Sequence, residues 1–144
     1  DAGANDNETA NNNVGIGYNT LQNNVSGAAN TAVGSTAMLS NTSGSNNSAF
    51  GRRALYSATT GSGNSAFGSQ SLESNTTGYS NVAFGYQSLT SNTTGYYNTA
   101  IGYESLESNT TGKYNTALGY EALSSSSGSD NNTALLTESH KPTL

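Results

Sequence analysis

An asparagine begins the same phrase eight times in this sequence, and successive copies are separated by a constant 17 residues. The fullest copies begin at Asn81 and Asn98, and no residue is inserted or lost between the first copy and the last. A fixed period through nearly the whole chain is typical of stacked-repeat proteins. We number the residues of each repeat from position 1, its asparagine, to position 17. The eight asparagines of position 1 are Asn13, Asn30, Asn47, Asn64, Asn81, Asn98, Asn115 and Asn132.

Two glycines divide each repeat into two short runs. Glycine occupies position 5 from Gly17 to Gly119 and position 15 from Gly27 to Gly112. Glycine at this density is unfavourable in a helix and supplies the positive φ or the close backbone approach that tight corners require. Each run between glycines has the length of a short strand. The sequence therefore predicts an all-β protein, a β-solenoid (β-roll) of about seven to eight 17-residue coils with two short strands per coil.

Two columns of large apolar side chains form the predicted core. Stacking coils about 4.8 Å apart places residues of the same position above one another, and large apolar residues recur at positions 4 and 9. Positions 3 and 8 carry only small side chains, which suits either a surface on which another chain packs or the inside of a flat coil. The position 4 column is Ile16, Val33, Phe50, Phe67, Phe84, Ile101, Leu118 and Leu135, and the position 9 column is Leu21, Met38, Leu55, Leu72, Leu89, Leu106 and Leu123.

Such a core is thin. Hydrophobic residues make up 32% of the sequence, against roughly 45–50% in typical globular domains. Two large side chains per coil are few, because ordering the backbone costs roughly 1–2 kcal/mol for each residue. We therefore expect the coils to bury further surface against sister chains, either laterally or end to end.

Charge and composition argue against several classes of function. The net charge is −5, and the four Lys and Arg residues are scattered, so we expect no nucleic-acid partner. No apolar stretch approaches the roughly 18 residues of a membrane-spanning helix, so we expect no membrane insertion. The chain has no cysteine, and its one histidine, His140, lies outside the repeats. We therefore expect neither an enzyme nor a metal or cofactor site.

The repeat also defines the domain organisation. Residues 13–136 form the predicted solenoid, residues 1–12 fit positions 6 to 17 of a preceding coil as a partial coil or assembly segment, and residues 137–144 are a non-repeating tail. Partial coils at both ends favour head-to-tail stacking of copies. The alternatives are a tail that caps the last coil, or a chain that is a fragment of a longer array. The candidate end contacts are Ala4, Asn7, Leu135, Leu136 and Pro142.

Tyrosines recur at position 6, where Tyr18, Tyr86, Tyr103 and Tyr120 share one column. Stacked exposed tyrosines suit the binding of sugar rings or of a partner surface. The interpretation that we favour is that they pack on one another and cover the thin core. Threonine recurs at position 2 and would suit an ice-binding array, but valine and serine interrupt that column.

Asparagines that match the Asn-x-Ser/Thr pattern of N-glycosylation recur at position 12. Glycosylation would place these turns on the surface of an exported protein. The interpretation that we favour is that Asn-Thr-Thr-Gly is turn chemistry. The candidate acceptors are Asn41, Asn75, Asn92 and Asn109.

The phrase Asn-Thr/Ser-Ala-apolar-Gly, as in residues 64–68 and 98–102, resembles the head repeats of trimeric autotransporter adhesins. The longer phrase of residues 98–112 is similar to repeats in phage and algal-virus tail-fibre proteins. The resemblance covers about residues 13–136 and implies a β-roll, commonly trimeric, that serves in surface attachment. This repeat is longer than is usual in the adhesin heads.

These observations together predict a structural, self-assembling fibre protein of the cell exterior or a virion surface, which stacks head to tail, as homotrimers, or both. The alternative is an adhesin or tail-fibre segment that binds a cell-surface receptor or glycan. A requirement for the position 6 tyrosines in binding would favour this alternative.

Overall fold

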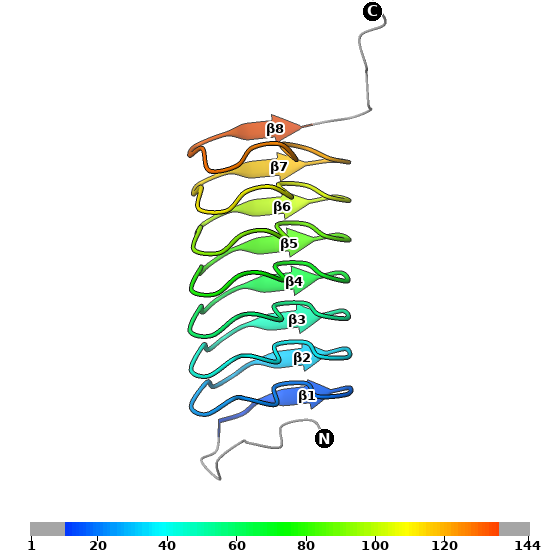
Figure 1. Ribbon diagram of the computed structural model, residues 1–144, viewed down its shortest axis with the longest axis vertical. Helices are drawn as coiled ribbons and strands as arrows, with labels where there is room; N and C mark the ends of the chain where they lie inside the picture. Colours follow the sequence, from blue (N-terminus) through cyan, green and yellow to red (C-terminus); the bar gives the residue numbers. More distant parts are fainter. Residues whose placement is uncertain (1–10, 136–144) are drawn as a thin grey trace, which may run out of the picture.

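In the computed structural model, residues 11–135 are described and form one continuous stack of coils (Figure 1). Each coil contributes one three-residue strand, and the eight strands form a single parallel sheet in chain order. Neighbouring strands pair with an offset of one repeat, so that Val14 lies beside Thr31 and Ile16 beside Val33. The all-β solenoid with a 17-residue coil is therefore confirmed. The strands are β1 (Val14–Ile16), β2 (Thr31–Val33), β3 (Ser48–Phe50), β4 (Ser65–Phe67), β5 (Val82–Phe84), β6 (Thr99–Ile101), β7 (Thr116–Leu118) and β8 (Thr133–Leu135).

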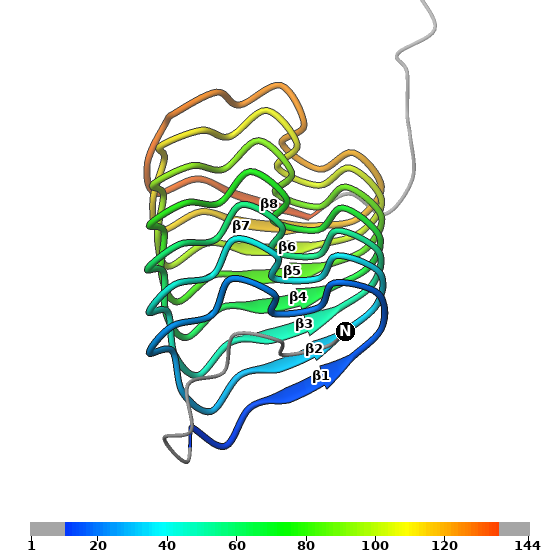
Figure 2. The ribbon, with the colours of Figure 1, turned by 60° about the horizontal axis from the view of Figure 1, so that its bottom comes forward.

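The middle residue of each strand points into the coil. The position 3 alanines from Ala32 to Ala117 are completely buried. The strands that carry them form one wall of the stacked coils (Figure 2). The same buried cluster contains alanines of position 8 and the large residues of position 9 from Leu21 to Leu106. Positions 3 and 8 thus carry small side chains because they lie inside a flat coil, where little space is available.

The position 4 column lies outside the core, so its predicted burial was wrong. Ile16 and Phe84 are 60% and 49% exposed. Side chains alternate between the two faces of a strand, and the buried alanine of position 3 forces position 4 to the opposite, outer face. The column comprises Ile16, Val33, Phe50, Phe67, Phe84, Ile101, Leu118 and Leu135, all exposed or only partly covered.

The position 9 column is buried as predicted. Leu21, Met38, Leu55, Leu72, Leu89 and Leu106 are at most 2% exposed, and Leu123 is partly buried against the same cluster.

The second run of each coil is not a strand, contrary to the prediction of two strands per coil. Residues at positions 7 and 9 have φ between 50° and 61°, in the left-handed region, which costs an L-residue roughly 1–2 kcal/mol. These residues curve the chain, so it cannot extend as a strand. Backbone bonding between coils continues nevertheless: the N–H of Leu72 donates to the Ser88 carbonyl at 3.0 Å, and that of Ser74 to the Thr90 carbonyl at 3.0 Å.

Both glycine columns are explained by contact between coils. Position 5 has φ between 124° and 143°, a range that only glycine adopts without strain. A Cβ at Gly85 would also meet the carbonyl oxygen of Gly102, and one at Gly78 would meet that of Gly95. Any side chain at these positions would separate neighbouring coils.

Candidate assembly surface

The outer face of the sheet carries a continuous apolar stripe. It consists of the position 4 side chains, one from each strand, beside the Thr, Ser and Val side chains of position 2. Three phenylalanines stack in its centre, with ring centroids 4.8 Å apart for Phe50 and Phe67 and 4.6 Å apart for Phe67 and Phe84. The stripe is most exposed where it reaches Ile16 and Leu135, which are 60% and 64% exposed.

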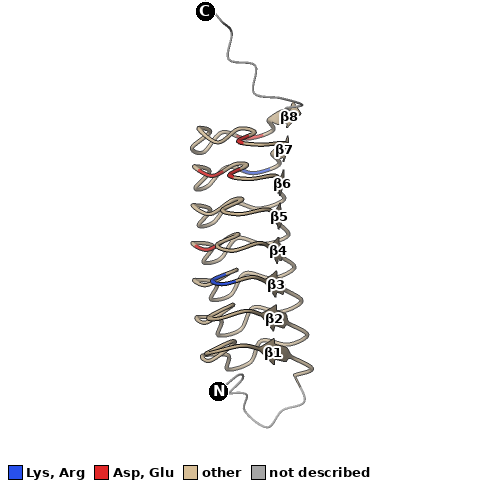
Figure 3. Ribbon diagram, turned by 90° about the vertical axis from the view of Figure 1, so that its right-hand side faces the viewer, with Lys and Arg blue, Asp and Glu red and all other residues tan. Residues whose placement is uncertain are grey.

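The same face carries no charge. None of the eight strands contains Lys, Arg, Asp or Glu, and in Figure 3 the charged residues colour only the connecting segments. Surfaces that remain free in solution usually carry interspersed charged side chains, which discourage association. Within residues 11–135, this face has none.

The strand face alone supplies only part of an interface, because stable interfaces bury roughly 800 Å² per partner. Seven steps of about 4.8 Å give a sheet about 34 Å long, and three residues give a width of about 10 Å. The flat projection is therefore on the order of 340 Å² per chain, which is comparable with the largest apolar patches of monomers, roughly 300–600 Å² and often functional. Flanking side chains of position 6 and of positions 16 and 17 would widen the contact.

Position 6 presents a ladder of tyrosines at the corner that follows each of the strands β5, β6 and β7. The ring centroids of Tyr86 and Tyr103 lie 5.4 Å apart and those of Tyr103 and Tyr120 lie 5.1 Å apart, both pairs stacked. The Tyr103 phenol is hydrogen-bonded to the Glu104 carboxylate, which together with partial desolvation raises the pKa of Tyr103 to about 12. The predicted column is therefore present in these coils. Tyr18 stands apart, because the next residue of its column is Ser35.

A second group of tyrosines occupies positions 16 and 17, before the strands. Tyr79 and Tyr96 are stacked with centroids 4.7 Å apart, and Tyr97 meets Tyr96 edge-on at 5.7 Å. Tyr114 stacks on Tyr97 at 5.5 Å. The Nζ of Lys113 lies 5.6 Å from the centroid of the Tyr96 ring, and a hydrogen bond with Tyr96 raises the pKa of Lys113. Aromatic side chains thus border the sheet on both sides in its C-terminal half.

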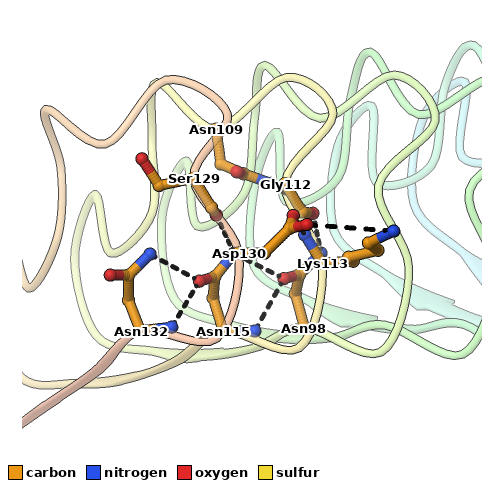
Figure 4. Close-up of polar contacts among 8 residues, drawn as sticks. All are labelled: Asn98, Asn109, Gly112, Lys113, Asn115, Ser129, Asp130 and Asn132. Atoms are coloured by element: carbon orange, nitrogen blue, oxygen red, sulfur yellow. Dashed lines mark hydrogen bonds and ion pairs between the residues drawn. The ribbon is translucent and has the colours of Figure 1, made fainter.

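The asparagines of position 1 form a buried ladder inside the coil (Figure 4). The Oδ1 of Asn98 accepts the backbone N–H of Asn115 at 3.0 Å and its Nδ2 at 3.1 Å. The Nδ2 of Asn98 also donates to the Gly112 carbonyl at 2.8 Å. Asparagine at position 1 is therefore explained by this bonding, because its amide joins three successive coils.

A second buried ladder occupies the predicted glycosylation sites, and it excludes them in the folded coil. Asn41, Asn75, Asn92 and Asn109 have no exposed surface. The Nδ2 of Asn92 donates to the Asn75 Oδ1 at 2.7 Å and to the Gly95 carbonyl at 3.1 Å. A glycan would have to be attached at this enclosed nitrogen. The turn-chemistry interpretation is closer to the structure, because the Asn92 Nδ2 bonds the Gly95 carbonyl of its own turn, although it also points inward and bonds Asn75 of the preceding coil.

The second ladder is interrupted where position 12 is not asparagine. Position 12 of the next coil is Ala58 after Asn41, and Ser126 after Asn109. The Oδ1 atoms of Asn41 and Asn109 are buried without a hydrogen-bond partner. Elsewhere in the ladder the following asparagine supplies the missing donor. These interruptions follow directly from the sequence of two repeats.

The candidate end contacts are only partly visible. Ala4, Asn7, Leu136 and Pro142 lie outside the described residues, whereas Leu135 lies at the end of β8 and is 64% exposed. Residues 11–135 include no helix that could span a membrane and no group of three His, Cys, Asp or Glu side chains placed to bind a metal ion.

Comparison of the chain with models of protein families, with curated proteins and with solved structures finds no match. The function is therefore argued from the geometry of the surface alone.

Proposed function

We propose that the protein is a structural, self-assembling fibre component that associates with copies of itself through the outer face of its sheet. The observation that carries this proposal is the uncharged apolar stripe of position 4, which runs along all eight strands. A stripe of this size exposed to water is unfavourable, since burying apolar surface contributes roughly 25 cal/mol per Å². Association would supply the burial that the thin core of each coil lacks.

The spacing of the stripe favours a copy of the same chain as the occupant. Its apolar rows repeat with every coil, one strand apart. A partner that fills the grooves between these rows needs matching rows at the same spacing over about 34 Å. A sister solenoid supplies both the spacing and an uncharged apolar surface. Homotrimers, or another closed arrangement around one axis, would bury the stripe of every chain.

Head-to-tail growth is the second part of the proposal. Every contact between neighbouring coils joins the upper surface of one coil to the lower surface of the next, which is a heterologous contact. The backbone bonds that run from Val14 to Asn30 recur from Thr116 to Asn132. A further coil from another chain would find the same pattern of donors and acceptors, so copies would stack into filaments on the exterior of a cell or a virion.

The position 6 ladder gives less support to the alternative of an adhesin that binds glycans. Sugar rings pack on the faces of aromatic rings, but both faces of Tyr103 are occupied by Tyr86 and Tyr120. The ladder offers its ring edges and hydroxyl groups to a ligand. Loss of glycan or cell binding in position 6 variants that still assemble would favour the adhesin.

The oligomeric state tests lateral association. We expect the purified chain to sediment as a trimer or larger species at low micromolar concentration. Phe67→Lys places a charge in the centre of the stripe without touching the core and should abolish lateral association, so that the variant sediments as single chains or as stacks one chain wide. The matched control is Ser74→Lys, in the same coil at position 11. A monomeric parent chain, or equal behaviour of the two variants, contradicts the assembly face.

Negative-stain electron microscopy tests head-to-tail stacking separately. Long unbranched filaments are expected. Short rods of uniform length would contradict stacking and leave lateral association alone.

A further inference from the structure

The tyrosines of position 6 combine three features that favour oxidative coupling. The first is their arrangement: Tyr103 and Tyr120 are stacked with an interplanar angle of 6°, and Tyr86 and Tyr103 with one of 18°. The unpaired electron of a tyrosyl radical occupies the π system, perpendicular to the ring. Two stacked rings therefore face each other with the orbitals that form the new bond.

The second feature is access to solvent. Tyr86 and Tyr103 are each 42% exposed and Tyr120 is 58% exposed. A soluble oxidant can reach these rings while the coils hold them in place. The backbone bonds between coils fix the spacing, as where the N–H of Glu121 donates to the Tyr103 carbonyl at 2.8 Å.

The third feature is a proton acceptor for the phenol. Hydrogen bonding with the Glu104 carboxylate and partial desolvation raise the pKa of Tyr103, and the Glu121 carboxylate raises the pKa of Tyr120. A phenol that loses an electron must also lose its proton, and a neighbouring carboxylate is a suitable acceptor for that proton. The two glutamates at position 7 thus assist the one-electron oxidation of the rings beside them.

We propose that the position 6 ladder is a site of dityrosine formation, at which a peroxide-dependent oxidant joins neighbouring coils covalently. Each of two stacked phenols loses one electron and one proton, and the two radicals form a carbon–carbon bond between ring positions ortho to the hydroxyls. The ring hydrogens at that bond then shift to the phenolic oxygens. The two electrons and two protons reduce one hydrogen peroxide to two waters. The link adds covalent strength along the axis and does not depend on the proposed self-assembly.

Other tyrosines of the chain provide internal references. Tyr18 is followed in its column by Ser35, and Tyr56 lies at position 10 between Leu39 and Glu73. The Arg53 guanidinium lies 4.6 Å from the ring centroid of Tyr56. These two tyrosines have no stacked tyrosine in a neighbouring coil and should not couple within the chain.

The test uses an equal mixture of ¹⁵N-labelled and unlabelled chain, treated with a haem peroxidase and hydrogen peroxide. Proteolytic fragments that contain Tyr86, Tyr103 and Tyr120 are then identified by mass spectrometry. We expect fragments joined with the loss of two hydrogens, carrying one isotope only, because the bond forms within a chain. Fragments that contain Tyr18 should remain unlinked.

Two variants make the test specific to the ladder. Tyr103→Phe leaves Tyr86 and Tyr120 two coils, about 10 Å, apart, so the linked fragment should be lost. Tyr120→Phe is the matched control and should retain the link between Tyr86 and Tyr103. Phenylalanine preserves the stacking, and an unchanged circular dichroism spectrum verifies the fold. Mixed-isotope links alone, or equal linkage of Tyr18, would overturn the proposal, whatever the oligomeric state.

Discussion

Removing one amide from the position 1 ladder should be among the most destabilising single substitutions in this chain. Asn81→Ala removes four buried hydrogen bonds. The Nδ2 of Asn81 donates to the Asn64 Oδ1 at 3.2 Å and to the Gly95 carbonyl at 2.8 Å. Its Oδ1 accepts the backbone N–H of Asn98 at 3.0 Å and the Nδ2 of Asn98 at 3.1 Å. After the substitution the backbone N–H of Asn98 is buried without a partner.

The magnitude follows from these bonds. At roughly 1 kcal/mol for each of the four hydrogen bonds, and roughly 1 kcal/mol or more for the orphaned backbone donor, the free energy of unfolding should fall by about 5 kcal/mol. Proteins of this size have a total stability on the order of 10 kcal/mol. The substitution therefore removes a large part of the stability.

Asn92→Ala in the second ladder is the matched comparison. It removes the bonds from the Asn92 Nδ2 to the Asn75 Oδ1 and the Gly95 carbonyl, and that from the Asn109 Nδ2 to the Asn92 Oδ1. No backbone N–H loses its partner, and the chain already carries alanine at this position in Ala58. The three bonds, at roughly 1 kcal/mol each, give an expected loss of about 3 kcal/mol.

Urea unfolding followed by circular dichroism gives both free energies, and hydrogen exchange of the Asn98 amide reports the local effect. Because repeat proteins can open coil by coil, the slope of the transition must be compared among the three proteins. Exchange of the Asn98 amide should accelerate in Asn81→Ala only. A cost for Asn92→Ala equal to or above that for Asn81→Ala would refute the reasoning.

Three further predictions concern single positions. Ala58→Asn should raise the free energy of unfolding by about 1–3 kcal/mol in a denaturation experiment, because the amide of the introduced asparagine supplies the donor that the Asn41 Oδ1 lacks. An unchanged free energy would mean that the new amide does not fit there. Leu72→Ala should lower it by about 2–5 kcal/mol through a cavity in the core, and a change below about 1 kcal/mol would contradict its burial. In an absorbance titration Tyr103 should ionise near pH 12, and Glu104→Gln should bring its pKa back toward about 10. Since the folded pKa of Tyr103 is raised, its contribution to stability is complete below about pH 10 and is lost as the pH rises through 12.

The coil, its period and the position 9 core were predictable because a 17-residue repeat allows few solutions other than stacking. The position 4 error came from treating large apolar residues as buried. The better signal was the small residue at position 3, since the narrow interior admits only alanine on the inner face of the strand. The same alternation of faces then places Phe67 outside.

The curved second run could not be predicted from the sequence. Left-handed backbone is expected at glycine or asparagine, whereas here Leu72 and Gln70 adopt it. The stacked coils impose this conformation through inter-coil bonding, a constraint that a single repeat does not reveal. The buried amide of Asn92 was hidden for a related reason, because an Asn-Thr-Thr-Gly turn looks exposed until the neighbouring coil is in place.

The asparagine ladders also give the stack an electrical direction. In both ladders the side-chain N–H points toward the preceding coil and the Oδ1 toward the following coil. The Nδ2 of Asn47 donates to the Oδ1 of Asn30, and the Nδ2 of Asn92 donates to the Oδ1 of Asn75. Aligned amide dipoles add along an axis, as they do in a helix, and hydrogen-bonded neighbours polarise one another. The N-terminal side of the rod is therefore partially positive and the C-terminal side partially negative. Two rods that approach end to end attract in one orientation and repel when like ends meet, so the electric field of the ladders would select a single polarity for the filament proposed above.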